Sequence, residues 1–325
     1  MIFWDIVEHT MLPLFFLVGV GYFLDKKFHL DLKTISKMIF YLIVPSFLFT
    51  NIYATSFPTT SFHMVGSLVL FMFLSFLLAT AVGRLRHYDQ GMMSSCRNAL
   101  MFNNTGNLGI AVILLIFSHS PFVVDGQTPY LQEAMTVQII LFVSQSVLLN
   151  TLGLYQGARG QYTPRDALRV ILHMPIIYAF LAALLCRWGG VDAKSFFLWP
   201  VLEMAGKCLL PVAMVGIGVQ LFKTKIEWFN REVEIVCLMK LFVMPIVGLL
   251  MIFAANHFWP GIFTPISALV FLIYCSIPTA VNTSLYAIEF HNHPDYATQC
   301  VLNTTVLSCI SITVFTAIGK ALFLG

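Results

Sequence analysis

The sequence predicts an all-α polytopic membrane protein of ten transmembrane helices, arranged as a 5+5 inverted repeat in which helices four and nine are broken and cross. Three observations lead to this fold class. Of 325 residues, 58% are hydrophobic and only 10% are charged, whereas a soluble domain has roughly 25% charged residues. Apolar runs of membrane-spanning length recur along the whole chain. Two of these runs contain polar interruptions at matching positions.

The composition also excludes other classes of protein. The mean hydropathy is +0.85, and the sequence contains no long polar segment that would make a sizeable soluble domain. The net charge is only +3 and the basic residues are dispersed, which argues against a nucleic-acid partner. The first residues, MIFWDIVEHT, carry Asp5 and Glu8 but no Lys or Arg. The first apolar run is therefore predicted to be a retained span and not a cleaved signal.

Ten apolar runs approach the length of about 20 residues that a membrane-spanning helix needs. They occupy residues 6–24, 34–53, 61–82, 91–117, 134–156, 167–187, 197–221, 233–258, 265–290 and 295–324. The loops after the first, third, fifth and seventh runs carry Lys26, Lys27, Lys33, Arg84, Arg86, Arg159, Arg165, Lys223, Lys225 and Arg231. Because Lys and Arg gather in cytoplasmic loops, both termini are predicted on the non-cytoplasmic side of the plasma membrane.

Residues 1–160 and 161–325 are predicted to be two related five-helix repeats. Pro13 and Pro45 in the first two spans match Pro175 and Pro211 in the sixth and seventh. The fourth span of each half contains a polar break. Because five is an odd number, the second repeat enters the membrane in the inverted orientation, as in many transporters.

The break in the fourth span is the stretch FNNTGNLGIAV. A buried amide without a partner costs roughly 2–7 kcal/mol in an apolar medium, so Asn103, Asn104 and Asn107 need protein or water around them. Gly106 and Gly109 permit unusual dihedral angles and a close approach of another backbone. The alternative is that these small and polar residues only pack helices together.

The break in the ninth span is the stretch SIPTAVNTS. Pro278 removes a backbone donor and interrupts the helix, while Thr279 and Asn282 supply a hydroxyl and an amide. Irregular backbone is tolerated at this depth only where protein or a water-filled cavity satisfies it. Two broken helices that cross at the bilayer centre would direct their half-helix N-termini at one point and favour an anion there.

Two lysines lie within predicted spans, where ionisable residues are costly. Lys207 in the seventh span follows Glu203 by four residues, so the two can pair on one helical face. Lys207 is a candidate for adding positive potential near an anionic substrate or for responding to a coupling proton; the alternative is a structural ion pair or a snorkelling lysine. Lys240 lies nearer the cytoplasmic end of the eighth span and is expected to snorkel.

The remaining polar and reactive residues have plainer interpretations. The seven cysteines show no ligand-like spacing and are expected to be small buried hydrophobes. His291, His293 and Asp295 form a loop cluster, for which a solvated loop is favoured over a metal site. Residues 303–305 either face the ninth span or pack against another helix. The sequence contains no HExxH, GxSxG or Walker A motif, so we expect no enzymatic activity, no cofactor and no resident metal.

Four stretches resemble the auxin efflux carrier family. DLKTISKMIFYLIVPSFLFTNI resembles the family's second span, NNTGNLGIA its fourth-span break, and LLPVAMVGIGVQL its seventh span. IPTAVNTSLYAIEFHNHPDYATQCVLNTTVLSCISI resembles its ninth span and the start of its tenth. The resemblance covers most of the chain. The short connection GARGQYTPRD, in place of a long cytoplasmic loop, is typical of bacterial members.

The resemblance implies a scaffold part and a mobile transport part that contains the crossed helices. It also implies carriage of small organic anions by an elevator-like movement. Asn104 would be the substrate-facing asparagine of the fourth-span crossing, with Pro278 and Asn282 as its ninth-span partners. Many members have a proline where this chain has Ala111, so here the fourth-span break is expected to depend on its two glycines.

Together these observations predict a secondary transporter of small organic anions, either malonate- or malate-like or auxin-like carboxylates. The candidate substrate-binding residues are Asn103, Asn104, Gly106, Asn107, Gly109, Lys207, Pro278, Thr279 and Asn282. The alternatives are a sodium-coupled carrier of the bile-acid symporter type, and a membrane receptor or enzyme built on the same spans. Coupling to H⁺ or Na⁺ stays open, as does assembly into a homodimer.

Overall fold

The computed structural model describes residues 8, 12–54, 61–158, 175–223 and 230–325, and this part of the chain is helical with no strands. The first half contains α2 (Leu12–Phe28), α3 (Leu32–Met38), η2 (Ile39–Ile43), α4 (Val44–Ala54), α5 (Ser61–Leu85), α6 (Gln90–Met101), η3 (Thr105–Gly109), α7 (Ile110–Ser118), α8 (Leu131–Leu148), η4 (Leu149–Gly153) and α9 (Leu154–Gly157). The second half contains α11 (Pro175–Trp188), η5 (Ala193–Ser195), α12 (Trp199–Lys207), α13 (Leu209–Lys223), α14 (Arg231–Leu238), η6 (Met239–Val243), α15 (Met244–Phe258), α16 (Pro265–Ser276), α17 (Val281–Glu289) and α18 (Pro294–Phe323).

Six of the described helices are long and apolar enough to cross a membrane, as expected for a polytopic membrane protein. They are Thr34–Ala54, His63–Leu85, Leu131–Gly157, Trp199–Lys223, Arg231–Phe258 and Pro294–Phe323. Tyr178–Trp188 and Pro265–Ser276 are shorter apolar helices. The start of the first predicted span and most of the connection GARGQYTPRD, with the predicted boundary between the repeats, lie outside the described residues.

Two of the long helices contain a π-helical turn just before a proline. The turn η2 is followed by Pro45 in α4, and the turn η6 is followed by Pro245 in α15. A proline lacks the backbone donor, and its ring clashes with the carbonyl of the preceding turn. A wider π turn accommodates both effects. The helices therefore continue through these prolines instead of ending at them.

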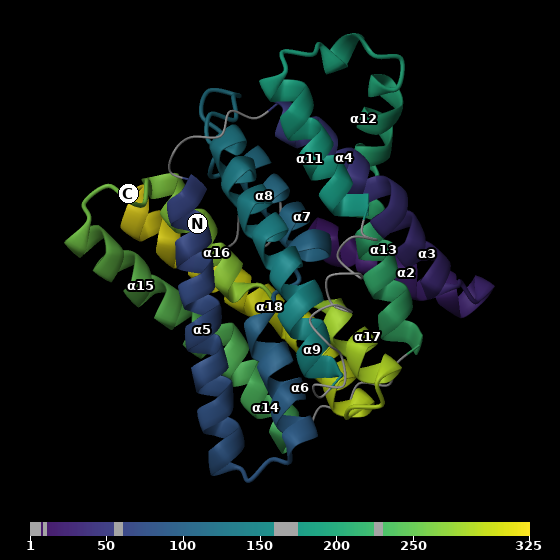
Figure 1. Cartoon of the computed structure of the whole chain (residues 1–325), viewed down its shortest axis with the longest axis vertical. Helices are drawn as coiled ribbons and strands as arrows, with labels where there is room; N and C mark the ends of the chain where they lie inside the picture. The colour runs from purple at the N-terminus through teal and green to yellow at the C-terminus, as the bar shows by residue number, and fades with distance from the viewer. Residues whose placement is uncertain (1–7, 9–11, 55–60, 159–174, 224–229) are drawn as a thin grey trace.

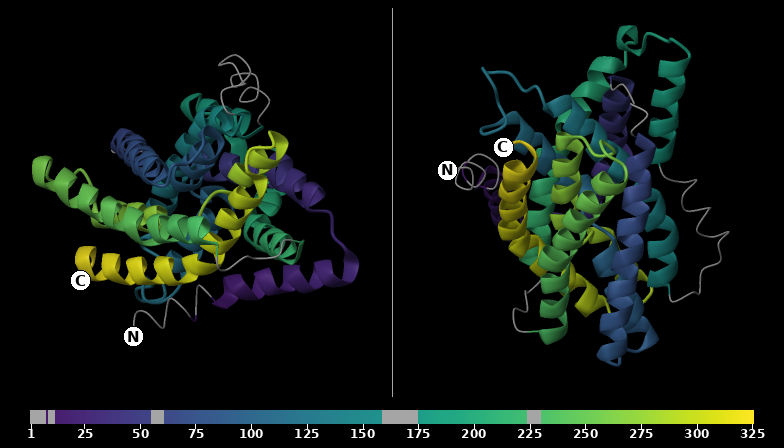
Figure 2. Two further views of the ribbon diagram at one scale, coloured as in Figure 1. Left: turned by 90° about the horizontal axis from the view of Figure 1, so that it is seen from below. Right: turned by 90° about the vertical axis from the view of Figure 1, so that its left-hand side faces the viewer.

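The helices pack as two groups (Figure 1). The first helix group comprises α2, α3, α4, α11, α12 and α13, in which α2 packs along α13 and α4 packs against α11 and α12. The second helix group comprises α5 to α9 and α14 to α18. In Figure 2, α15 and α18 of this group extend side by side, with the rings of Phe253 and Phe323 in contact. The two groups meet where α13 contacts η3 and α7, and where α4 contacts α8.

Two glycines allow the close packing of α2 on α13. A Cβ at Gly218 would lie 2.0 Å from the carbonyl oxygen of Val18, and a Cβ at Gly21 would lie 2.2 Å from that of Val215. No side chain fits at these distances, so glycine is required at both positions for the two backbones to touch. This backbone contact joins the first and seventh predicted spans within the first helix group.

Candidate functional site

The fourth predicted span is broken in the structure. The helix α6 ends at Met101, and the turn η3 begins only at Thr105. Between them, Phe102 is extended (φ −106°, ψ 122°), and Asn104 has also left helical geometry (φ −75°, ψ 60°). The chain then returns to a helix through η3 and α7. The interruption therefore lies on the N-terminal side of both glycines in this stretch.

The ninth predicted span is broken as well. The helix α16 ends at Ser276, and α17 begins at Val281. Ile277 is extended (φ −69°, ψ 140°), and so is Ala280 (φ −65°, ψ 133°). The new helix therefore starts with the free N–H groups of its first turn beside the break, because these groups have no partner within their own helix.

The two breaks pair with each other, and we call residues 102–104 and 277–280 together the crossing. Asn104 N–H donates to the carbonyl oxygen of Pro278 at 2.8 Å, and Ala280 N–H donates to that of Phe102 at 2.9 Å. Residues 103 and 279 form an antiparallel bridge between these two hydrogen bonds. Each interrupted span therefore supplies backbone partners that the other has lost, which makes irregular backbone tolerable inside an apolar bundle.

Asn103 uses its polar atoms to hold the crossing together. Its Nδ2 donates to the carbonyl oxygen of Tyr274 at 2.6 Å, and its Oδ1 accepts a hydrogen bond from Lys240 Nζ. Its backbone N–H donates to Gln145 Oε1 at 3.1 Å, and its carbonyl oxygen accepts from Gln145 Nε2 at 2.6 Å. Each polar atom of Asn103 therefore already has a protein partner at the crossing.

Lys240 is part of the same network, so the prediction that it snorkels is wrong. Its side chain is 0% exposed. Its Nζ donates to the carbonyl oxygens of Leu100 (2.8 Å) and Phe102 (3.4 Å) as well as to Asn103 Oδ1. These three acceptors match the three N–H donors of an ammonium group. None of the ion pairs formed by the described residues includes Lys240. The amine of Lys240 therefore lies buried beside the break of the fourth span.

Lys207 does not join this network. Its side chain is 73% exposed on the surface of α12, where its Nζ lies 3.0 Å from Glu203 Oε1. This is the ion pair predicted from the spacing of four residues. The structure therefore places Lys207 on the outside of the first helix group and places Lys240 at the crossing.

Two buried amides at the crossing keep an unpaired atom. Asn104 is 5% exposed, and its Nδ2 has no hydrogen-bond partner in the part of the chain that the structure describes. Gln138 is 0% exposed and donates from Nε2 to the carbonyl oxygen of Thr105 at 3.2 Å. Its Oε1 has no hydrogen-bond partner among the described residues. A buried unpaired group costs on the order of 1–3 kcal/mol. One donor at the crossing and one acceptor beside it are thus left without a partner among the described residues.

The glycines of the fourth span allow close packing but do not adopt unusual dihedral angles. Gly109 is helical (φ −61°), and Gly106 is not among the described glycines with positive φ. A Cβ at Gly109 would lie 2.6 Å from Gln138 Nε2, and a Cβ at Gly106 would lie 2.8 Å from Phe142 Cε2. Neither glycine has a positive φ, so the break does not use the conformational freedom that glycine permits. The extended residues before the glycines make the break, which explains why it forms with Ala111 in place of a proline.

The remaining predicted site residues lie around the crossing. Thr279 N–H donates to Thr304 Oγ1 at 3.2 Å, and Thr279 Oγ1 donates to the carbonyl oxygen of Ala99 at 2.9 Å. Of the two alternatives for residues 303–305, contact with the ninth span is confirmed at Thr304. Asn282 lies half-buried in the first turn of α17. The side chain of Asn107 lies outside the described part of the structure.

Sequence reasoning missed the glutamines that hold the crossing from the fifth span. Gln138 and Gln145 both bond to residues of the fourth-span break, and Gln145 Nε2 also donates to Thr105 Oγ1 at 3.0 Å. The hydroxyl of Tyr274 donates to Gln145 Oε1 at 2.6 Å. The available signal was the spacing of seven residues, because polar residues two helical turns apart in an apolar span lie on one face.

The loop cluster at residues 291–295 is packed against the second helix group. His293 Nε2 lies 3.2 Å from Asp89 Oδ1, and the hydrogen bond from Met92 N–H lowers the pKa of the Asp89 carboxyl. Asn292 is fully buried. Among the described residues, no three or more His, Cys, Asp and Glu side chains form a group that could hold a metal ion.

The apolar helices and the paired breaks in two of them are typical of membrane transporters. A family model described as "Membrane transport protein" matches residues 6–316, so the chain belongs to this family, and the predicted relation to the auxin efflux carriers is confirmed. A protein of Methanothermobacter thermautotrophicus, described as "Uncharacterized transporter", is 23% identical over 328 residues, which cover 98% of this chain and 100% of the relative.

Membership of this family defines the general role of the chain. It is a membrane-embedded transport protein, and six of its described helices are long and apolar enough to cross a membrane. A membrane transporter is generally not an enzyme, which agrees with the expectation from the sequence.

Proposed function

We propose that the protein is a secondary transporter of small organic anions, specifically carboxylates, and that the crossing is its substrate site. The observation that carries the proposal is the buried, unpaired Nδ2 donor of Asn104, adjacent in sequence to the asparagine that accepts a hydrogen bond from Lys240. An anion bound here would pair the free donor and lie in the field of a buried positive charge.

The backbone adds further donors for a carboxylate. The helical segments that follow the two breaks begin at Thr105 and Val281. The first N–H groups of a helix have no partner within the helix, and the dipole places partial positive charge at this end. Helix N-termini are therefore common anion sites. Asn282, half-buried in the first turn of α17, is proposed as a second amide contact.

We assign to Lys240 the electrostatic role for which Lys207 was one candidate from the sequence. A buried charge without an opposite charge is costly, and the described ion pairs leave Lys240 without one. Its hydrogen bonds to oxygen atoms of the fourth span offset part of this cost. A bound carboxylate would supply the opposite charge, so the crossing is expected to favour an anion.

Ten spans in an inverted 5+5 repeat are part of this proposal. Each of the ten predicted ranges contains at least part of a described helix, and the two breaks lie in the fourth range of residues 1–160 and of residues 161–325. The antiparallel bridge between the breaks supports the proposal, because two inverted copies bring equivalent segments together in opposite directions.

The proposed mechanism is elevator-type alternating access. The first helix group would act as the scaffold, and the second helix group would carry the crossing. What supports this division is that α2 packs along α13, and α4 against α11 and α12, within the first group, whereas the groups meet through α13 and α4. The proposed orientation in the plasma membrane places both termini on the non-cytoplasmic side.

Counterflow in proteoliposomes tests the proposal. Purified protein is reconstituted with an unlabelled carboxylate inside, and uptake of labelled carboxylates is compared between the wild type and Asn104→Ala. We expect exchange by the wild type and a loss of about tenfold or more in the variant, since a lost hydrogen bond to a charged group is worth about 1.5–3 kcal/mol. Asn51→Ala, in α4 of the first helix group, is the matched control and should exchange normally.

Three outcomes separate the alternatives. A requirement for sodium on replacement by choline would favour a sodium-coupled carrier. Saturable binding of a carboxylate without exchange would indicate a receptor. Absence of exchange for all carboxylates, or equal exchange by Asn104→Ala and the wild type, would contradict the assignment of the crossing as the substrate site.

A further inference from the structure

The acceptors around the buried amine of Lys240 suit both its uncharged and its charged form. The amine donates to the carbonyl oxygen of Leu100 at 2.8 Å and to Asn103 Oδ1, whereas the carbonyl oxygen of Phe102 is farther away, at 3.4 Å. Phe102 O also accepts the N–H of Ala280 at 2.9 Å. An uncharged amine has two N–H donors, and the ammonium adds a third. A proton can therefore be added to Lys240 or removed from it without a rearrangement of the crossing.

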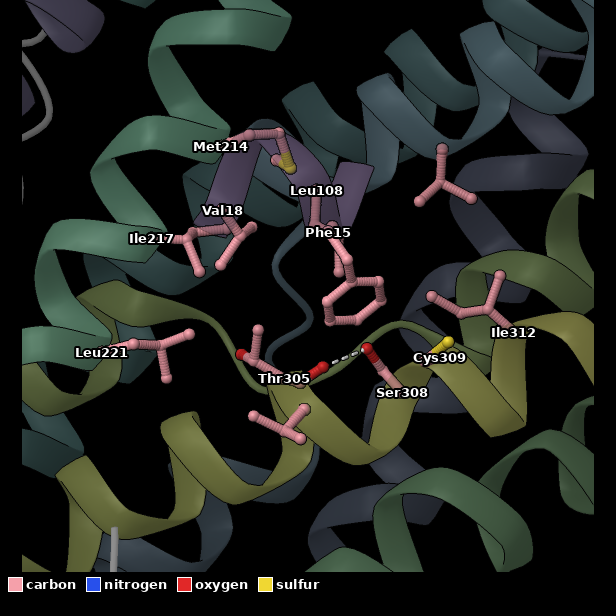
Figure 3. A pocket seen from close by; sticks show the side chains of 12 residues that line it. Phe15, Val18, Leu108, Met214, Ile217, Leu221, Thr305, Ser308, Cys309 and Ile312 are labelled. Carbon is pink, nitrogen blue, oxygen red and sulfur yellow. Dashed lines mark hydrogen bonds between the residues drawn. The ribbon is translucent and has the colours of Figure 1, made fainter. Parts of the chain in front are cut away.

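In the part of the chain that the structure describes, no carboxylate pairs with this amine. None of the described ion pairs includes Lys240. The pocket between the two helix groups, shown in Figure 3, is lined by Leu108 and Thr305 beside the crossing, and its twelve lining residues include no Asp or Glu. A buried ammonium without an opposite charge is costly, and an amine avoids that cost by remaining uncharged.

The titratable groups of α16 that face Lys240 are weak acids. The helices α6, α16 and α18 pack against η6, which contains Lys240. Cys275 of α16 lies near enough to interact electrostatically with the amine. The hydroxyl of the neighbouring Tyr274 donates to Gln145 Oε1 at 2.6 Å. A protonated thiol and a protonated phenol carry no charge, so neither offsets an ammonium.

The charged residues of the other packed helices have different surroundings. Arg97 of α6 is directed at α5, where its Nε donates to Thr80 Oγ1 at 2.9 Å. Asp295 and Lys320 lie in the first and last turns of the 30-residue helix α18. Glu232, two turns before Lys240 on its own helix, pairs with Arg86. These helices therefore bring no described negative charge to the amine.

We infer that the protein carries a proton together with its carboxylate and that Lys240 is the group that binds this proton. The inference rests on the proposed function of the crossing. As the carboxylate enters, the uncharged Nζ takes one proton from solution and forms a third N–H bond. The same bond breaks and the proton returns to solution when the carboxylate leaves. Each charge lowers the cost of burying the other, so binding of either one strengthens binding of the other.

The inference fixes the charge that moves with a substrate. With a monocarboxylate, the loaded crossing holds one anion and one ammonium, and the empty crossing holds an uncharged amine. Neither form then carries a net charge at the crossing through the apolar bundle, where an unpaired charge is strongly unfavourable. The transporter is accordingly a symporter of carboxylate and H⁺ that needs no sodium.

Calorimetry of binding tests the inference, because titrations in two buffers of different ionisation enthalpy count the protons taken up for each carboxylate bound. The probe is the carboxylate that exchanges fastest in the counterflow panel, with malonate and indole-3-acetate offered first. At alkaline pH we expect uptake of about one proton per carboxylate and an apparent affinity that falls up to about tenfold for each unit of pH. Binding without proton uptake at every pH would overturn the inference and leave the proposed function intact. Failure of the whole panel to bind or exchange would contradict both.

An arginine variant assigns the proton to its residue. A guanidinium remains charged, so Lys240→Arg should take up no proton for each carboxylate that it binds, and this ratio does not depend on the amount of folded protein. Lys207→Arg, at the exposed lysine of α12, is the matched control and should keep the wild-type ratio. An unchanged ratio in Lys240→Arg would place the proton on another group and overturn the assignment.

Transport by the wild type gives a test that needs no variant. The monocarboxylate of the panel that exchanges fastest, with indole-3-acetate and pyruvate offered, is supplied to proteoliposomes under an imposed pH gradient or an imposed membrane potential. An acidic exterior should drive accumulation inside, and the potential should have no effect. Vesicles without protein correct for passive entry of the undissociated acid. Uptake that follows the potential and ignores the pH gradient would contradict symport with a proton.

Discussion

Lys240 donates a hydrogen bond to Asn103 Oδ1 across a separation of 137 residues. This contact joins the π turn in the eighth span to the extended residues in the fourth span. The same ammonium binds the carbonyl oxygens of Leu100 and Phe102, which the break leaves without helical donors. The lysine therefore links three oxygen atoms at the crossing, and its amine lies beside the proposed carboxylate site.

Replacement of this lysine is expected to abolish transport. In Lys240→Met the carbonyl oxygen of Leu100 and Asn103 Oδ1 lose the donor that Lys240 supplies, at a cost on the order of 1–3 kcal/mol for each unsatisfied group. The melting temperature in detergent should fall, and carboxylate counterflow should be lost. Lys207→Met is the matched control, and because Lys207 is 73% exposed it should keep wild-type values for both. The proposed role of Lys240 would be wrong if its variant exchanged carboxylates at the rate of the control.

The amide of Gln145 is expected to stabilise the fold through the two hydrogen bonds that it donates. Gln145→Glu keeps the size of the side chain but removes the donors to Asn103 O and Thr105 Oγ1. We expect the free energy of unfolding to fall by about 2 kcal/mol or more, because buried acceptors are left unpaired.

Thermal unfolding in detergent measures this effect against Gln132→Glu, an exposed position on the same helix. The control should unfold at the wild-type temperature. Equal melting temperatures of the two variants would show that Gln145 does not stabilise the break.

The ion pair between α2 and α13 predicts an asymmetric effect of substitution. The Asp25 carboxylate is 1% exposed and lies 3.0 Å from Lys223 Nζ, which is 40% exposed. Lys223→Met leaves a buried carboxylate without its partner, and removal of one partner costs about 3–5 kcal/mol in fully buried pairs. We expect Lys223→Met to lower the free energy of unfolding by less than this, because Lys223 reaches solvent. Asp25→Asn should lower it still less, because this variant removes the buried charge.

Melting temperatures of the two single variants and of the double variant test this order. The double variant should be close to Asp25→Asn, because the carboxylate that needs Lys223 is then absent. A Lys223→Met protein that is as stable as the wild type would show that the pair contributes nothing to packing of the first helix group.

The contact of α2 with α13 predicts that Gly218→Ala is strongly destabilising. The added Cβ would lie 2.0 Å from the carbonyl oxygen of Val18, so the two helices must separate. Overpacking of this kind typically costs about 1–3 kcal/mol. Gly66→Ala in α5 is the matched control, because a Cβ there meets nothing within 4 Å and Ala favours the helix by about 0.5–1 kcal/mol. Gly218→Ala should unfold at a lower temperature than Gly66→Ala. The reverse order would contradict the close contact of α2 with α13.

The two lysines show what a sequence pattern can and cannot predict about this site. Both lie inside predicted spans, and the pairing of Lys207 with Glu203 follows from their spacing on one helix. Which lysine faces the crossing depends on the rotation of each helix about its own axis, which is decided by packing against other helices. The expectation from the sequence was therefore correct for the local pair and wrong for Lys240.

The positions of the breaks were predictable because their causes are local. Pro278 removes a backbone donor, and a run of asparagines cannot remain unpaired in an apolar bundle. The dihedral angles were less predictable, since the extended residues 102–104 depend on partners from other spans. Their hydrogen bonds come from Pro278, Gln145 and Lys240.

The sequence by itself determined the class of the protein, the apolar spans and the two places where a span is interrupted, because composition, hydrophobic length and proline act locally along the chain. The tertiary structure decided which polar groups of the breaks have hydrogen-bond partners among the described residues and which have none. Asn103 and Asn104 are neighbours of the same residue type, yet Asn103 is bonded on all sides and Asn104 keeps a free donor. That difference arises because partners from the eighth and ninth spans reach the side chain of Asn103, while no described partner reaches the Nδ2 of Asn104.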